Sequence, residues 1–184
     1  MRQNLGKLST LGAQVCCTPP VSAIDHLLHA NEAYAARFEG ARPQRPKLRL
    51  AVVACMDSRL DLFGALGLQI GDAHLIRNAG GLPTEDVLRS LAVSQHSLGT
   101  REVVVIHHTE CGMEGFDDDA FRRRLTDDTG VAPEWSVPGF SDIRLTVRKS
   151  ISVVRGCPWL PHRDDVRGFV FDVATARLEE VEAD

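Results

Sequence analysis

Two cysteines and one histidine in this chain have side chains and positions suited to a metal site. Cys55 ends one short apolar run, His108 ends another, and Cys111 follows His108 three positions later. Thiolate sulfur and imidazole nitrogen are ligands that zinc prefers, and catalytic zinc sites use three protein ligands with a fourth position for water. No nearby Cys-x-x-Cys pair supplies the fourth protein ligand of a structural site. The three residues therefore predict an open zinc site.

A second interpretation of the same residues stays open at this point. A single His-x-x-Cys spacing is a weak signal, so Cys55 and Cys111 also fit buried apolar thiols and His108 a hydrogen-bonded core histidine. Two other chemistries of Cys55 are excluded. A cysteine phosphatase needs an arginine six residues after the cysteine, where this chain has Asp61, and a thioredoxin-like site needs a Cys-x-x-Cys pair, which is absent.

Short apolar runs alternating with amphipathic stretches must position these side chains. The runs are typical of strands buried on both faces, and the stretches repeat apolar residues at three- and four-residue steps. This alternation predicts the α/β class, with a mostly parallel central β-sheet flanked by α-helices. We expect strands at 48–55, 73–77, 102–107, 166–173 and 177–181, and helices at 22–38, 84–98, 116–125 and 141–154.

Polar residues gather after three of the predicted strands. Ligands in open parallel sheets bind outside the carboxyl ends of the strands, so these residues are expected to meet at one edge. The three segments are 55–59 (CMDSR), 77–81 (RNAGG) and 107–112 (HHTECG). They bring thiols, imidazole, carboxylates, guanidinium groups and paired glycines together. His107 is expected to point to the opposite face from His108, because side chains alternate along a strand.

Three motifs in this order resemble those of the β-class carbonic anhydrases, most closely the short bacterial and archaeal branch. They are Cys55-x-Asp57-Ser58-Arg59, Arg77-Asn78-Ala79-Gly80 and His108-x-x-Cys111-Gly112. The resemblance runs from the predicted helix at 22–38 to the closing strands and leaves out residues 1–20. Three motifs in sequence are far more specific than any one of them.

The resemblance implies Zn²⁺ on Cys55, His108 and Cys111, and a zinc lyase that interconverts carbon dioxide and bicarbonate with release of a proton. Zinc-bound hydroxide would attack the carbon. Asp57 would accept a hydrogen bond from the bound water or hydroxide and aim its lone pair, and Arg59 would keep Asp57 ionised and oriented. For Asp57 and Arg59 the alternative is an ordinary surface ion pair at a strand end.

A substrate pocket is predicted from five further residues. Gly80 and Gly81 would let the backbone approach its floor, with a plain tight turn as the alternative. Phe63, Leu82 and Val87 would line it with apolar surface, with core packing as the alternative for each. Arg77 and Asn78 would tie the strand ends together.

Two rival functions remain. Relatives of this family hydrolyse carbonyl sulfide or carbon disulfide on the same zinc site, and pocket width would decide between these linear molecules. The rival of another class is a non-catalytic zinc- or bicarbonate-binding regulator. Intact Asp57 and Arg59 argue against an inactive site.

Composition limits the partners and the location that are expected for this chain. The chain has 184 residues, a hydrophobic content of 43% and a net charge of -4, with Lys and Arg scattered, so nucleic-acid binding is not expected. No apolar run approaches the length of a membrane span. The five cysteines are an odd number for a disulfide framework, and the first residues lack a secretory signal, which together predict a reducing, cytoplasmic location.

The domain organisation predicted from the sequence is simple. Residues 1–20 show no sustained periodicity and end in two prolines, so a disordered tail is expected there, followed by a single catalytic α/β domain at 21–184. The family resemblance further implies a homodimer or higher homo-oligomer, with the helix at 22–38 packing across a partner.

Overall fold

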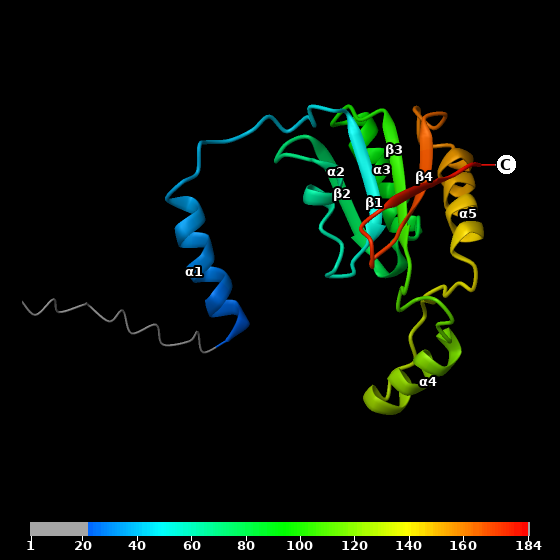
Figure 1. Ribbon diagram of the computed structural model, residues 1–184. Helices are drawn as coiled ribbons and strands as arrows, with labels where there is room; N and C mark the ends of the chain where they lie inside the picture. The colour runs from blue at the N-terminus through cyan, green and yellow to red at the C-terminus, as the bar shows by residue number, and fades with distance from the viewer. Residues whose placement is uncertain (1–21, 184) are drawn as a thin grey trace, which may run out of the picture. The chain divides into compact units, whose positions relative to one another are not determined.

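The computed structural model describes residues 22–183 (Figure 1). The described part of the chain divides into two units, the first ending at Ala41 and the second beginning at Arg42. The tail predicted at 1–20 lies outside the described residues. The single domain predicted at 21–184 stays a prediction.

The described part of the first unit is built around helix α1, Ala23–Ala35. It begins where the sequence predicts, because the Ser22 side-chain oxygen accepts a hydrogen bond from the Asp25 backbone N–H at 3.1 Å. It ends at Ala35 rather than at 38. None of its residues is buried, and its apolar side chains Ile24, Leu27 and Leu28 are 68%, 65% and 61% exposed.

The second unit contains one sheet, which confirms the predicted α/β class. Within the described residues its strand order is β2-β1-β3-β4-β5. The first four strands of this order pair in parallel, and β5 runs antiparallel to β4. The strands are β1 (Leu50–Cys55), β2 (Ala73–Asn78), β3 (Glu102–His108), β4 (Val166–Phe171) and β5 (Leu178–Val181).

Helices α3 (Glu85–His96) and α5 (Ile143–Gly156) lie against the sheet (Figure 1), and their apolar side chains cover one of its faces. Alternate strand residues point to this face, so Val53 and Val105 share a core with Leu91 and Ile151. The residues between them point to the other face. There Val52, Ala54 and Ile106 share a second core with the short helix α2 (Leu62–Leu66) and with the loops that follow β3.

Two short elements were not predicted: α2 and the 3₁₀ helix η1 at Ala79–Gly81. Both are too short for an apolar repeat to be detected. The remaining helix, α4 at Asp118–Thr129, begins at the acidic segment and extends further than the predicted 116–125. Its N-cap is Asp117, whose side chain accepts a hydrogen bond from the Ala120 backbone N–H.

Among residues 22–183, no helix combines the length and the apolar character that crossing a membrane would require.

Candidate metal centre

Strands β1 and β3 place the candidate ligands. They are parallel neighbours, with Ala54 paired to Ile106, so Cys55 and His108 leave the same edge of the sheet. The chain then reverses at Glu110, whose φ of 55° lies in the left-handed region. This reversal brings Cys111 back over the strand ends.

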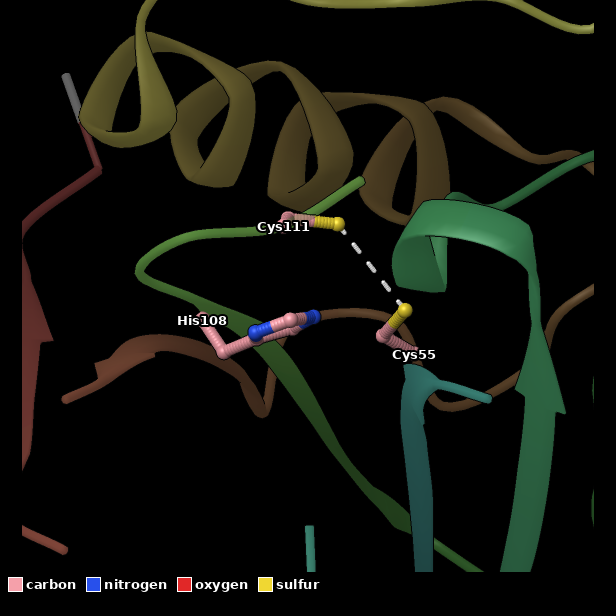
Figure 2. A group of neighbouring side chains, drawn as sticks. All are labelled: Cys55, His108 and Cys111. Atoms are coloured by element: carbon pink, nitrogen blue, oxygen red, sulfur yellow. Dashed lines mark hydrogen bonds between the residues drawn. The ribbon is translucent and has the colours of Figure 1, made fainter. Parts of the chain in front are cut away.

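The structure brings the three predicted ligands together, and all three are buried. Their ligand atoms lie within 4.8 Å of one another, and the two sulfur atoms are 3.9 Å apart. Figure 2 shows Cys55 at the end of β1, His108 at the end of β3 and Cys111 on the loop beyond, with their side chains turned toward one another.

The hydrogen bonding of His108 suits a metal ligand. Its Nδ1 lies 2.9 Å from the Thr109 carbonyl oxygen, which can only accept, so the ring proton belongs on Nδ1. Nε2 then carries a lone pair, and this buried atom has no hydrogen-bond partner within the described part of the chain. Burial also lowers the pKa of His108, which favours the neutral imidazole that binds metals.

The two thiols also point to a cation. Burial raises the pKa of Cys111 to about 11, with the neighbouring Cys55 as a further cause. Two thiolates could not persist so close together in this core without a positive charge, whereas a bound metal ion deprotonates a coordinating thiol. The donor set therefore fits a divalent metal with a preference for sulfur and nitrogen.

Asp57 and Arg59 form a tight pair beside these ligands. Arg59 Nε donates to Asp57 Oδ1 at 3.0 Å, NH2 donates to Oδ2 at 2.8 Å, and the Arg59 backbone N–H donates to Oδ1 at 2.9 Å. These bonds hold the pKa of Asp57 well below its usual range. Asp57 Oδ2 lies 3.8 Å from His108 Nε2, so an ionised carboxylate stands at the edge of the candidate metal centre.

Arg77 ties the ends of β1 and β2 together, as predicted. Its Nε donates to the Cys55 carbonyl oxygen at 2.8 Å, and its NH2 donates to the Asp57 carbonyl oxygen at 2.6 Å. Asn78 instead closes the η1 turn, since its side chain donates to the Leu82 carbonyl at 2.8 Å and accepts from the Leu82 N–H at 3.0 Å.

Gly81 allows the backbone to pass directly under Cys55. Its φ is 67°, and a Cβ there would lie 2.7 Å from the Cys55 backbone nitrogen and 2.8 Å from the Ala54 carbonyl carbon. Such contacts are not tolerated, so the position requires glycine for both its space and its conformation. Gly80 is buried beside it, next to Met113.

The other three residues of the predicted pocket are not brought together. Val87 lies on α3 and packs in the core between that helix and the sheet, which is the alternative that the sequence left open. Leu82 lines a cavity of about 430 Å³ that also borders α5, and Phe63 lines a different cavity of about 540 Å³ beside β2. None of the three candidate ligands lines either cavity.

His107 points away from the candidate metal centre, as strand alternation predicts. Its Nε2 lies 3.0 Å from the Ser150 hydroxyl on α5, and the ring of Phe140 packs against it edge-on. Burial lowers the pKa of His107 to about 4, so this imidazole is neutral in the folded protein near pH 7.

Two neighbours of the candidate ligands, Thr109 and Glu110, lie in the polar segment predicted after β3, but the sequence assigned neither of them a role. Thr109 supplies the carbonyl that orients His108, and Glu110 contacts Arg59 through both its carboxylate and its carbonyl oxygen. Their position between His108 and Cys111 is the only signal of their importance in the sequence. A left-handed backbone at a glutamate is not visible there.

Comparisons with known proteins agree with this geometry. A family model described as carbonic anhydrase matches residues 50–135. The chain is 47% identical over 161 residues to "Beta-carbonic anhydrase 1" of Mycobacterium tuberculosis, covering 88% of this chain and 99% of that protein. It is 34% identical over 151 residues to a "Carbon disulfide hydrolase" of Acidithiobacillus thiooxidans, covering 71% of this chain and 75% of that protein.

A crystal structure of a carbonic anhydrase from Streptococcus mutans has the same fold, with a TM-score of 0.82 and 42% identity over 88% of this chain and 98% of that one. Sequence, fold and the cluster of two cysteines and a histidine thus agree. The chain belongs to the β-carbonic anhydrase family.

Proposed function

We propose that this chain binds one Zn²⁺ through Cys55, His108 and Cys111 and catalyses the reversible hydration of carbon dioxide to bicarbonate and a proton. The observation that carries the proposal is the buried Cys-His-Cys group with an unpartnered imidazole nitrogen, next to a carboxylate held by Arg59. The 47% identity to a β-carbonic anhydrase supports the same reaction.

The donor set also supports an open rather than a structural site. Within the described residues, no fourth His, Cys, Asp or Glu side chain joins the group. When bound, the metal ion supplies the Lewis acidity that lowers the pKa of a water molecule toward neutrality. Two anionic sulfur ligands weaken that effect relative to three imidazoles, which explains the need for help from the protein.

Asp57 provides this help. Because Arg59 keeps it ionised, its carboxylate can accept a hydrogen bond from the attacking water and turn a lone pair toward carbon dioxide. Buried apolar neighbours, among them Leu60 and Met113, keep bulk water away and suit a small uncharged substrate. The proton lost by the water then passes to solvent.

Hydrolysis of carbon disulfide or carbonyl sulfide is a second candidate, because relatives named carbon disulfide hydrolases are 28% to 34% identical to this chain. The test compares two rates on one zinc-loaded sample. Carbon dioxide hydration is followed by stopped flow with a pH indicator, and carbon disulfide hydrolysis by release of sulfide. Rapid hydration with little sulfide release supports the proposal, and the reverse contradicts it. A hydration rate equal to that of buffer would instead favour the non-catalytic regulator.

Two further properties belong to the proposal. The apolar face of α1, formed by Ile24, Leu27 and Leu28, is exposed in the single chain, which supports a homodimer or higher homo-oligomer. Cys55, Cys111 and Cys157 form no disulfide bond within the described residues, which supports a reducing, cytoplasmic location.

A further inference from the structure

Arg59 binds two acidic residues at once. Its NH2 group donates to Asp57 Oδ2 at 2.8 Å and also to the Glu110 carbonyl oxygen at 3.0 Å. Its NH1 group donates to the Glu110 carboxylate at 3.2 Å. With the Nε bond to Asp57, these contacts occupy four of the five N–H donors of the guanidinium group.

The backbone at Glu110 makes this double contact possible. Its left-handed φ of 55° is uncommon for a residue with a long side chain and costs conformational energy. The loop is held on its other side, where the Thr109 N–H donates to the Phe171 carbonyl and the Val173 N–H donates to the Thr109 hydroxyl. Glu110 therefore directs both its carbonyl and its carboxylate toward one side of Arg59.

We propose that Glu110 is a positioning residue for the reaction: it holds Arg59 along the NH1/NH2 edge of the guanidinium group, next to the Nε/NH2 edge that binds Asp57, so that the guanidinium group keeps Asp57 Oδ2 beside His108 Nε2. This inference rests on the proposed role of Asp57. The carboxylate and the carbonyl oxygen of Glu110 both bind Arg59, so Glu110 acts through Arg59 and is not itself a catalytic residue.

A second anchor matters because Arg59 is accessible to solvent. Its side chain is 46% exposed, whereas that of Asp57 is 17% exposed. A long side chain in a single exposed ion pair keeps much of its rotamer freedom, and such pairs contribute little on their own. Bonds to a strand end along one edge and to the ligand loop along the next restrict that freedom. Through Arg59, they also link Asp57 to the loop between His108 and Cys111.

The first test measures the anchoring of Arg59 without using activity. Zinc-loaded wild type, Glu110→Gln and Glu110→Gly are treated with phenylglyoxal, and the modification rate of each arginine is followed by peptide mass spectrometry. Glu110→Gln removes the charge, and Glu110→Gly removes the side chain while favouring the left-handed backbone. The Arg59 rate should rise about two- to fivefold in both variants, as expected for loss of one exposed ion pair. Arg89, paired with Glu85 on α3, serves as internal reference and should not change.

The second test asks whether the effect passes through Asp57. Glu110→Gln should keep its zinc and lose about two- to fivefold in kcat with KM unchanged, and the loss should shrink at 1 M salt, where screening is strong. In a chain that already carries Asp57→Asn, Glu110→Gln should cause no further loss of kcat. Glu114→Gln, an exposed glutamate just beyond Cys111, is the matched control and should behave as wild type.

An unchanged Arg59 modification rate in Glu110→Gln would overturn the inference. So would a loss of kcat that persists in full in the Asp57→Asn background, because the residue would then act on the loop rather than through Arg59. If wild type itself showed no hydration, the proposed function would fail, while the phenylglyoxal rates would still decide whether Glu110 anchors Arg59.

Discussion

The residues around His108 hold its imidazole in a form that suits metal binding. The Thr109 carbonyl fixes the proton on Nδ1, and burial keeps the ring neutral, so the free nitrogen faces the two sulfur atoms. Arg59 does the same for Asp57 by keeping it ionised and aimed. At the scale of single residues, the candidate site thus depends on the hydrogen bonds that orient its polar side chains. A main-chain carbonyl orients His108, and a guanidinium group orients Asp57.

Asp57→Asn tests the role of the carboxylate. The amide retains the size of the side chain but can no longer accept two hydrogen bonds as an anion. We expect zinc content to stay at the wild-type level and turnover at neutral pH to fall about 10²-fold, the lower range for loss of a general base. Stopped-flow hydration and metal analysis on the same preparation measure both.

Asp128→Asn, at the exposed end of α4, is the control and should keep full activity. Unchanged turnover in Asp57→Asn would show that the carboxylate takes no part in the reaction.

At the scale of elements, η1 approaches the end of β1 closely, directly beneath the candidate ligand Cys55. Gly81 and Gly130 both have left-handed backbones, with φ of 67° and 74°. Only Gly81 is crowded, because a Cβ there would meet the backbone of Cys55, whereas a Cβ at Gly130 would meet nothing within 4 Å.

Gly81→Ala should therefore lower the free energy of unfolding by about 2–4 kcal/mol, combining left-handed strain with overpacking. Gly130→Ala should cost only about 1 kcal/mol, from strain alone. Urea denaturation of both variants gives the comparison. Equal losses would mean that the contact under Cys55 is relieved by movement of the turn.

Most of the strands and helices that position the candidate site were predictable from the sequence. The apolar runs predicted β1 and β3. Because ligands bind at the carboxyl ends of parallel strands, the sequence also predicted that Cys55 and His108 lie at the same edge of the sheet. The helix α2 was not predicted, because five residues are too few for a repeat. The contact of Glu110 with Arg59 was also missed, because it depends on a local backbone angle that no spacing of residue types encodes. The cavities beside Phe63 and Leu82 depend on packing between distant segments.

At the scale of the whole molecule, His107 links stability to pH. An unfolded histidine binds a proton near pH 6.5, while burial lowers the pKa of His107 in the folded protein to about 4. Between these values the unfolded state binds more protons, so stability falls as the pH falls.

We expect the unfolding free energy of wild type to drop by about 2 kcal/mol more than that of His107→Gln between pH 8 and pH 5. Urea titrations of the two zinc-loaded proteins at each pH give this difference, in which metal release common to both cancels. Parallel stability curves would show that His107 takes up its proton in the folded state.

The exposed face of α1 predicts association of copies. Replacing Leu27 and Leu28 by glutamate should leave the second unit folded and reduce the assembly, because charges cannot be buried in an apolar interface. Light scattering should give a mass of at least twice 20.2 kDa for wild type and near 20.2 kDa for the variant. A wild-type mass near 20.2 kDa would contradict the proposed oligomer.

The proposal that Cys55, His108 and Cys111 hold a catalytic zinc ion is tested by measuring zinc stoichiometry and carbon dioxide hydration on one sample, for wild type, Cys111→Ser and Cys157→Ala. Cys157 is equally buried but lies in the core on the other face of the sheet, which makes it the matched control. We expect one zinc per chain with rapid hydration in wild type and Cys157→Ala, and loss of both in Cys111→Ser. A Cys111→Ser variant that keeps its zinc and its hydration rate would contradict the proposal.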